Sequence, residues 1–117
     1  MNTRLFAAVD TSRIVRPTIH FRGMPSEIAG ERGKREELPY PSVLVIKETS
    51  SGVFLIRYAA DGSDVGDTWH LNIADAQHQA QVEYDEAVGE WKPVPLEITD
   101  LIEFVRAIDR LCRRASQ

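Results

Sequence analysis

Cysteine is almost absent from this 117-residue sequence, which contains only Cys112. A single cysteine excludes an internal disulfide, and no C-x-x-C pair is present to hold a zinc ion. Small secreted domains usually carry an even set of cysteines, so the lone cysteine favours a reducing compartment. We therefore expect a cytoplasmic protein.

Long apolar runs are absent as well. Residues 43–46 and 53–56 are uninterrupted apolar runs, but a membrane-spanning helix needs roughly 20 such residues in succession. Near the amino terminus, the apolar stretch 5–9 is shorter than a signal-peptide core of about 7 or more residues. We expect neither a membrane span nor a signal peptide.

Basic side chains are scarce in the middle of the chain. The whole sequence has 14 Lys and Arg against 18 Asp and Glu, a net charge of −4. Residues 39–98 alone hold three basic and ten acidic side chains, a net of −7. An acidic body opposes binding to phosphate backbones, so we expect no nucleic acid partner. A basic protein surface is the better electrostatic match.

Motifs that carry catalysis or metal binding are also missing. His20, His70 and His78 show neither H-x-x-x-H nor H-E-x-x-H spacing, and no G-x-S-x-G or phosphate-binding glycine motif occurs. Cys112 falls on the apolar side of a predicted helix, where a thiol is unreactive. We expect no catalytic residue, metal or cofactor, and a non-enzyme is favoured.

Three carboxylates recur at every third position in the segment D-G-S-D-V-G-D, as Asp61, Asp64 and Asp67. A calcium-binding EF-hand loop needs ligands at positions 1, 3 and 5 and a Glu at position 12. Position 12 here is Asn72. Asp and Gly are favoured in turns on local grounds, so the segment predicts a turn.

Apolar and alternating segments predict a β-sheet. Residues 42–48 and 53–59 are rich in β-branched and aromatic side chains, and the connection between them ends in Gly52, which suits a hairpin turn. Their apolar runs predict burial on both faces over part of the hairpin, and hence a central place in the sheet. Further segments are expected to be strands or strand-like: 18–22, 66–71, the short edge segment 91–95, and 3–9 as either a strand or a helical turn.

Two amphipathic helices are predicted after the strands. Asn72 is the expected N-cap of a helix over residues 73–88, with Gly89 at its C′ position. A second helix is predicted over residues 100–115, with acidic residues leading and arginines trailing. The expected fold class is α+β, an antiparallel sheet of about four or five strands from residues 3–71, with both helices packed on one face.

Residues 23–41 interrupt the predicted strands. They are rich in glycine, proline and charged residues, with almost no apolar periodicity. This composition predicts an exposed polar loop, which is longer than most connections within a domain. We expect one domain over residues 1–117 with this loop on its surface.

The two tryptophans lie in contrasting contexts. Trp69 shares a strand face with Leu71 and is predicted to lie in the core, beneath the first helix. Trp91 follows Gly89 and precedes two prolines, so we expect it to be the more exposed of the two. An exposed tryptophan is a candidate centre of a binding surface.

A set of residues between positions 53 and 95 resembles small uncharacterised bacterial proteins. These share a D-T-W-H strand, an A-x-x-Q-A-x-x-E-Y helix and a following W-x-x-V/I-P segment. Some such small acidic proteins look like immunity-type partners in toxin systems. The resemblance implies no catalytic residue. In this sequence the motif residues are Asp67, Thr68, Trp69, His70, Ala76, Gln79, Ala80, Glu83, Tyr84, Trp91, Pro93, Val94 and Pro95.

Two classes of function remain open from the sequence. The first is a non-enzymatic protein-binding module, immunity-like and directed at a basic partner, acting as a monomer or a homodimer. The second is a small enzyme or ligand-binding protein with a site between the sheet and the first helix, using His70, Glu83 or Tyr84. The candidate interaction surface consists of Asp61, Asp64, Asp67, His70, Glu83 and Trp91.

Overall fold

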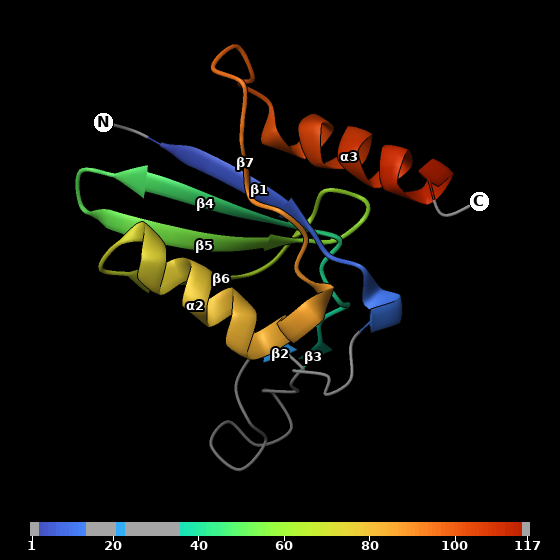
Figure 1. Ribbon diagram of the computed structural model, residues 1–117, viewed down its shortest axis with the longest axis horizontal. Coiled ribbons are helices and arrows are strands. Elements are labelled where there is room, and N and C mark those ends of the chain that lie inside the picture. The colour runs from blue at the N-terminus through green and yellow to red at the C-terminus, as the bar shows by residue number, and fades with distance from the viewer. Residues whose placement is uncertain (1–2, 14–20, 23–35, 116–117) are drawn as a thin grey trace.

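A five-stranded antiparallel sheet forms the centre of the protein in the computed structural model (Figure 1). The structure describes residues 3–13, 21–22 and 36–115. The strand order across the sheet is β6-β5-β4-β1-β7, and the α+β fold class is confirmed. The strands are β1 (Arg4–Ala8), β4 (Val43–Thr49), β5 (Gly52–Tyr58), β6 (Asp64–His70) and β7 (Lys92–Pro93).

The other elements within the described residues are two α-helices, two single-turn 3₁₀ helices and a second small sheet. The helices are α2 (Ile73–Tyr84), α3 (Leu101–Ala115), η1 (Thr11–Arg13) and η3 (Asp85–Ala87). Strands β2 (Phe21–Arg22) and β3 (Glu36–Glu37) pair with each other in a separate two-stranded sheet. None of the helices in the described part of the chain is both long and apolar enough to cross a membrane.

The β4–β5 hairpin is the middle of the sheet, as predicted. Its register runs from Val43 opposite Tyr58 to Thr49 opposite Gly52, and Gly52 has the positive φ of 144° that a glycine adopts most easily. The Thr49 hydroxyl donates to the Gly52 carbonyl at 2.9 Å. Side chains of β4 point alternately to the two faces, and Val43 and Leu44 are both fully buried. Both faces of this strand are therefore covered.

Helix α2 covers one face. Its small Ala76 and Ala80 allow a close approach to Leu44 and Leu55, and Tyr84 fills the end of this cluster. Helix α3 covers the opposite face, where Val105 packs with residues such as Val43, Val45 and Tyr58. The edge-to-face pair Phe6–Phe104, with ring centroids 5.0 Å apart, also joins α3 to the sheet.

The expectation that both helices pack on one face is therefore wrong. Consecutive apolar residues in β4 present a hydrophobic surface on each side of the sheet, and a single helix can bury only one of them. The segment that carries β7 runs along β1 at the edge of the sheet and connects η3 to α3 (Figure 1). This connection brings the chain from one face to the other.

Helix α2 begins as predicted and ends earlier than predicted. Asn72 Oδ1 accepts the Asp75 backbone N–H at 2.8 Å, which satisfies a free donor of the first turn. The helix stops at Tyr84 because Asp85 adopts a positive φ of 47°. Gly89 is not its cap, since its N–H bonds to the Ala8 carbonyl at 2.8 Å. A Cβ at Gly89 would lie 3.1 Å from that oxygen, so the glycine serves this close approach.

The predicted exposed loop at residues 23–41 is only partly described. Residues 23–35 lie outside the described residues, as do residues 18–20 of the predicted 18–22 strand. Toward the end of the loop, β3 forms over Glu36–Glu37, Pro39 and Tyr40 are exposed, and Pro41 is fully buried. Residues 3–9 resolve as a strand, β1, followed by a bridge from Val9 to Val88.

Candidate functional site

Trp69 lies on a part of the sheet that α3 does not cover. Its Cα partner is Phe54, whose own partner in β4 is Lys47. Because alternate residues of a strand share a face, Phe54 and Ile56 point to the α3 side, and Trp69 does so with them. Helix α3 packs on β1 and β4, and 52% of the Trp69 surface stays exposed.

The Trp69 ring is exposed and yet held in place. Its Nε1–H donates to the Ser51 carbonyl at 3.1 Å. The ring lies across Gly52, where an added Cβ would come 2.0 Å from Nε1. An aromatic ring placed over a glycine in a strand shields the backbone that the missing side chain leaves open. The indole is thus preorganised, with its orientation set before any partner arrives.

The predicted order of exposure of the two tryptophans is therefore wrong. Trp91 is half-buried against the cluster beneath α2. In β6, Thr68 and His70 occupy the α2 side, so the alternation of the strand sends Trp69 to the other face. Leu71 lies beyond the end of the strand and is also exposed.

Two of the three predicted aspartates, Asp64 and Asp67, lie on the same strand as Trp69. Asp67 pairs with Ile56 and shares the face of Trp69, while Asp64 pairs with Tyr58. Burial raises the pKa of Tyr58, and the negative charges of Asp64 and Asp67 raise it further. Both carboxylates therefore lie close enough to Tyr58 to influence its ionisation. Asp64 Oδ1 also accepts the Gly66 N–H at 2.8 Å.

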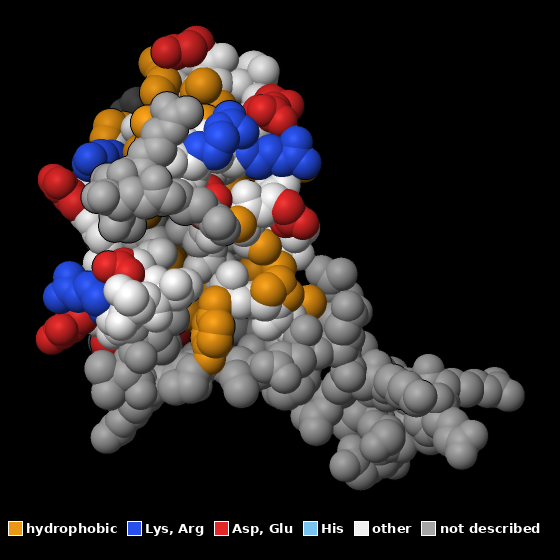
Figure 2. Space-filling view, turned by 90° about the vertical axis from the view of Figure 1, so that its right-hand side faces the viewer, with side chains coloured by type: hydrophobic (Ala, Val, Ile, Leu, Met, Phe, Trp, Pro, Cys, Tyr) orange, Lys and Arg blue, Asp and Glu red, His pale blue; other side chains and the backbone are white. Residues whose placement is uncertain are grey.

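Asp61 belongs to a turn that docks on α3. Its Oδ1 accepts the Ser63 hydroxyl at 2.6 Å and the Ser63 N–H at 2.9 Å. These two hydrogen bonds lower the pKa of the Asp61 carboxyl. Arg106 Nε donates to the Asp61 carbonyl at 2.8 Å, so a cation lies beside this aspartate. Among the described side chains on the face shown in Figure 2, acidic and basic groups are intermixed.

His70 and Glu83 lie inside the protein instead of on this surface. Glu83 forms a two-pronged ion pair with Arg57, in which Arg57 Nε donates to Glu83 Oε1 at 2.9 Å and Nη2 donates to Oε2. The two side chains are 1% and 5% exposed. Gln79 Nε2 donates to the same carboxylate at 2.6 Å. The carboxylate is therefore satisfied from two elements, β5 and α2.

The hydrogen-bond network continues from Arg57 along β6. Arg57 Nη2 lies 3.4 Å from Thr68 Oγ1, which lies 2.7 Å from His70 Nε2. His70 Nδ1 lies 3.0 Å from Asp75 Oδ2. A ring that donates from Nδ1 to the carboxylate accepts the Thr68 hydroxyl at Nε2. The network thus ties β6 to the first turn of α2.

Tyr84 lies beside this network with a buried hydroxyl that has no hydrogen-bond partner among the described residues. Burial raises the pKa of Tyr84 strongly, and the Glu83 charge raises it further while Arg57 opposes the change. Of the side chains proposed for a ligand site between sheet and helix, Glu83 and His70 are thus linked through Arg57 and Thr68. Their polar atoms mainly hold α2 on the sheet.

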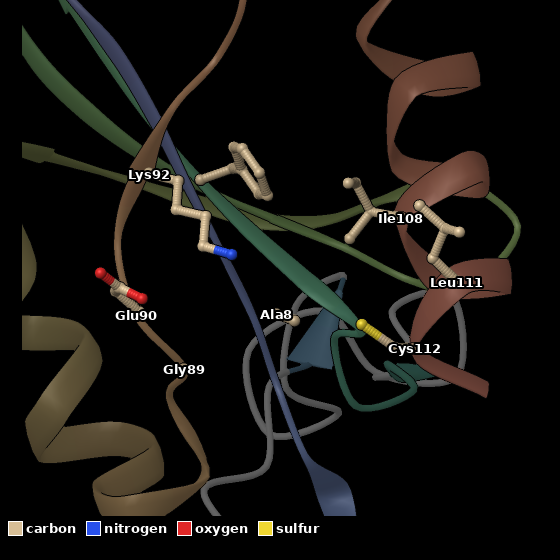
Figure 3. A pocket seen from close by; sticks show the side chains of 8 residues that line it. Ala8, Gly89, Glu90, Lys92, Ile108, Leu111 and Cys112 are labelled. Carbon is tan, nitrogen blue, oxygen red and sulfur yellow. The ribbon is translucent and has the colours of Figure 1, made fainter. Parts of the chain in front are cut away.

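A pocket of about 260 Å³ lies elsewhere, between α3 and the β1–β7 edge (Figure 3). In Figure 3, Ile108, Leu111 and Cys112 face Lys92 and Ala8 across this space. His70 and Glu83 are not among its lining residues. Within the described ranges, no group of three or more His, Cys, Asp or Glu side chains is arranged to hold a metal ion.

Sequence reasoning missed Arg57, although a signal was present. Arg57 interrupts the apolar strand segment V-F-L-I-R-Y-A, and a charged residue is almost never buried without a partner. Glu83 lies one position before the core residue Tyr84, and Gln79 precedes it by one helical turn. A search for the partner of a buried arginine would have indicated this glutamate.

Comparisons with protein-family models, with curated proteins and with solved structures find no match to this chain.

Proposed function

We propose that this chain is a non-enzymatic protein-binding module and that Trp69 is the centre of its binding surface. The observation that carries the proposal is the half-exposed indole, held over Gly52 by its bond to Ser51. Tryptophan is among the residues most enriched at binding hot spots. A ring that is already oriented loses little conformational freedom on binding, so more of its contact energy contributes to affinity.

The chemistry around Trp69 favours a basic partner. Asp67 lies on the same face, and Asp64 begins the same strand. Opposite charges across an interface speed association and reject like-charged competitors. An immunity-type inhibitor in the cytoplasm, which the D-T-W-H resemblance suggests, is one form of such a module. The internal bonding of His70 and Glu83 supports binding over catalysis, since these groups are occupied by Asp75 and Arg57.

The proposal is tested by affinity capture with matched variants. The native chain, Trp69→Ala and Val82→Ala would each be immobilised and exposed to extract of the producing organism. Val82 is a matched control because it is also an exposed apolar residue, on the outer side of α2. We expect one protein to be retained by the native chain and Val82→Ala but lost with Trp69→Ala.

The captured protein would then be purified and titrated by calorimetry. Loss of a hot-spot tryptophan weakens binding by about 2 kcal/mol or more, which is about 30-fold. Circular dichroism and thermal melts would show that Trp69→Ala remains folded. Equal affinity of Trp69→Ala and the native chain for the purified partner would contradict the proposal.

A further inference from the structure

The two edges of the central sheet are unequal. At one edge, β7 has two residues, and one of them is Pro93, which has no backbone N–H to donate. At the other edge, β6 has seven residues and no proline. Among the described elements, those that pack against β6 are β5 and α2 (Figure 1). The sheet thus ends on one side in a short strand with a proline and on the other in a long strand.

Residues 67–70 are the regular part of this long edge. Their pairing with β5 is continuous from Asp67 opposite Ile56 to His70 opposite Val53, and the register shifts only between Ile56 and Tyr58. Before this stretch, the Gly66 N–H is taken by Asp64 Oδ1. A strand at a sheet edge has backbone donors and acceptors on its outer side that pair with water or with an added strand. The D-T-W-H segment is therefore the part of β6 most suited to pairing.

We infer that the partner of the Trp69 surface binds as an extended strand alongside residues 67–70, with basic side chains next to Asp67 and Trp69. This inference rests on the proposed function and specifies its geometry. Side chains directly opposite each other on neighbouring strands lie about 4.5–5.5 Å apart at Cβ. An arginine at such a position reaches the Asp67 carboxylate, and one beside Trp69 stacks on the indole face.

The charges of β6 select against a second copy of this chain. Two β6 strands paired edge to edge would bring Asp64 and Asp67 of both copies to one short stretch, and like charges on paired strands are destabilising. A basic strand converts the same carboxylates into attractive contacts. Charge complementarity therefore identifies a basic segment as the occupant.

The inference is tested with a synthetic seven-residue peptide of alternating threonine and arginine, blocked at both ends. The Trp91→Phe chain leaves Trp69 as the only tryptophan, so its fluorescence reports on this surface. Three peptides would be compared: the parent, the same sequence with N-methylated backbone nitrogens, and a version with glutamate in place of arginine. We expect the parent to shift the Trp69 emission and to slow amide hydrogen exchange at residues 67–70. N-methylation and glutamate replacement should each weaken binding at least tenfold.

Variants of the chain give a second comparison. Asp67→Lys should weaken binding of the parent peptide at least tenfold, whereas Glu90→Lys, an exposed acid near the opposite edge, should leave it unchanged.

Equal binding of the parent and N-methylated peptides would overturn strand addition. So would a parent peptide that leaves Trp69 emission and exchange unchanged. In either case, Trp69-dependent capture of a partner would still support the proposed function, whereas loss of that dependence would refute the proposed function itself.

Discussion

On the α2 side of the sheet, Arg57 and Glu83 lie buried among aliphatic side chains, with Gln79 and Thr68 completing their hydrogen bonds. On the α3 side, the helix is held by apolar and aromatic contacts such as Phe6 with Phe104. Two helices of similar length thus cover one sheet by different chemistry. The helices differ in the side chains that face the sheet: α2 places alanines there, and α3 places larger apolar residues.

This contrast shows how a weakly amphipathic helix can be placed accurately. Ala76 and Ala80 bury little area and would permit sliding, since small side chains interlock poorly. The two-pronged Arg57–Glu83 pair has one good geometry, so it specifies where α2 lies along the sheet. Burying two charges has a large desolvation cost, and the surrounding hydrogen bonds offset it. Helix α3 is positioned by its larger apolar side chains instead.

The largest effect should come from breaking the buried pair. Glu83→Ala leaves the Arg57 guanidinium buried without its carboxylate, and we expect a loss of about 3–5 kcal/mol in the free energy of unfolding. Urea denaturation would measure it. The control is Glu86→Ala, which removes a pair with Arg13 between side chains that are 58% and 77% exposed and should cost under about 1 kcal/mol.

A double variant tests whether the cost of Glu83→Ala comes from leaving the Arg57 charge buried and unpaired. Arg57→Met with Glu83→Leu removes both charges together, so it should be less destabilised than Glu83→Ala alone. If Glu83→Ala and Glu86→Ala cost the same, the ion pair does not hold α2 as described.

The next largest loss of stability is expected on the α3 side of the sheet. Phe104 is half-buried against Phe6, and Phe104→Ala should cost about 2–4 kcal/mol. Leu111 lies on the same apolar stripe in the sequence, which predicts a similar cost, but it is 60% exposed. We therefore expect less than about 1 kcal/mol for Leu111→Ala. Equal losses in parallel denaturant melts would mean that the end of α3 packs more closely than the structure indicates.

Much of the fold could be predicted from local pattern. The hairpin, the Asn72 cap and helix α3 follow from alternation, capping and amphipathic spacing, all of which act over a few residues. The distribution of the helices over two faces depends on how the β7 connection crosses the sheet edge. That crossing depends on contacts between residues far apart in the sequence, so local periodicity does not predict it.

The candidate site was harder to predict for a related reason. In β6, polar Thr68 and His70 face the interior and Trp69 faces outward, which reverses the usual preference of a half-buried strand. The reversal is explained by partners that lie far away in the sequence or on another element: Arg57 of β5 lies beside Thr68, and Asp75 of α2 lies beside His70. Hydropathy alone therefore assigned Trp69 to the wrong face.

A smaller effect distinguishes the two tryptophans directly. In Trp91→Phe, the remaining Trp69 should be quenched readily by acrylamide, because half of its surface is exposed. In Trp69→Phe, the remaining Trp91 should be quenched less, since it packs against the α2-face cluster. Trp69→Phe should cost at most about 1 kcal/mol, as expected for a largely exposed ring. Stronger quenching of Trp91 would restore the order of exposure that the sequence predicts.

The smallest change in stability at pH 7 is expected for Tyr84→Phe, and this variant differs clearly from the native chain only at alkaline pH. Burial and the nearby Glu83 charge raise the pKa of Tyr84, so this phenol stays protonated in the folded state when an unfolded tyrosine ionises near about pH 10. Above that pH the unfolded state binds fewer protons than the folded state, and the free energy of unfolding falls as pH rises.

Tyr84→Phe removes this contribution together with an unpartnered hydroxyl, so it should change stability by under about 1 kcal/mol at pH 7. Between about pH 10 and 11.5, the native chain should lose stability faster than the variant by up to about 1.4 kcal/mol per pH unit. Urea melts at pH 7 and pH 11 measure both quantities, and parallel alkaline losses in the two chains would show that Tyr84 ionises without unfolding.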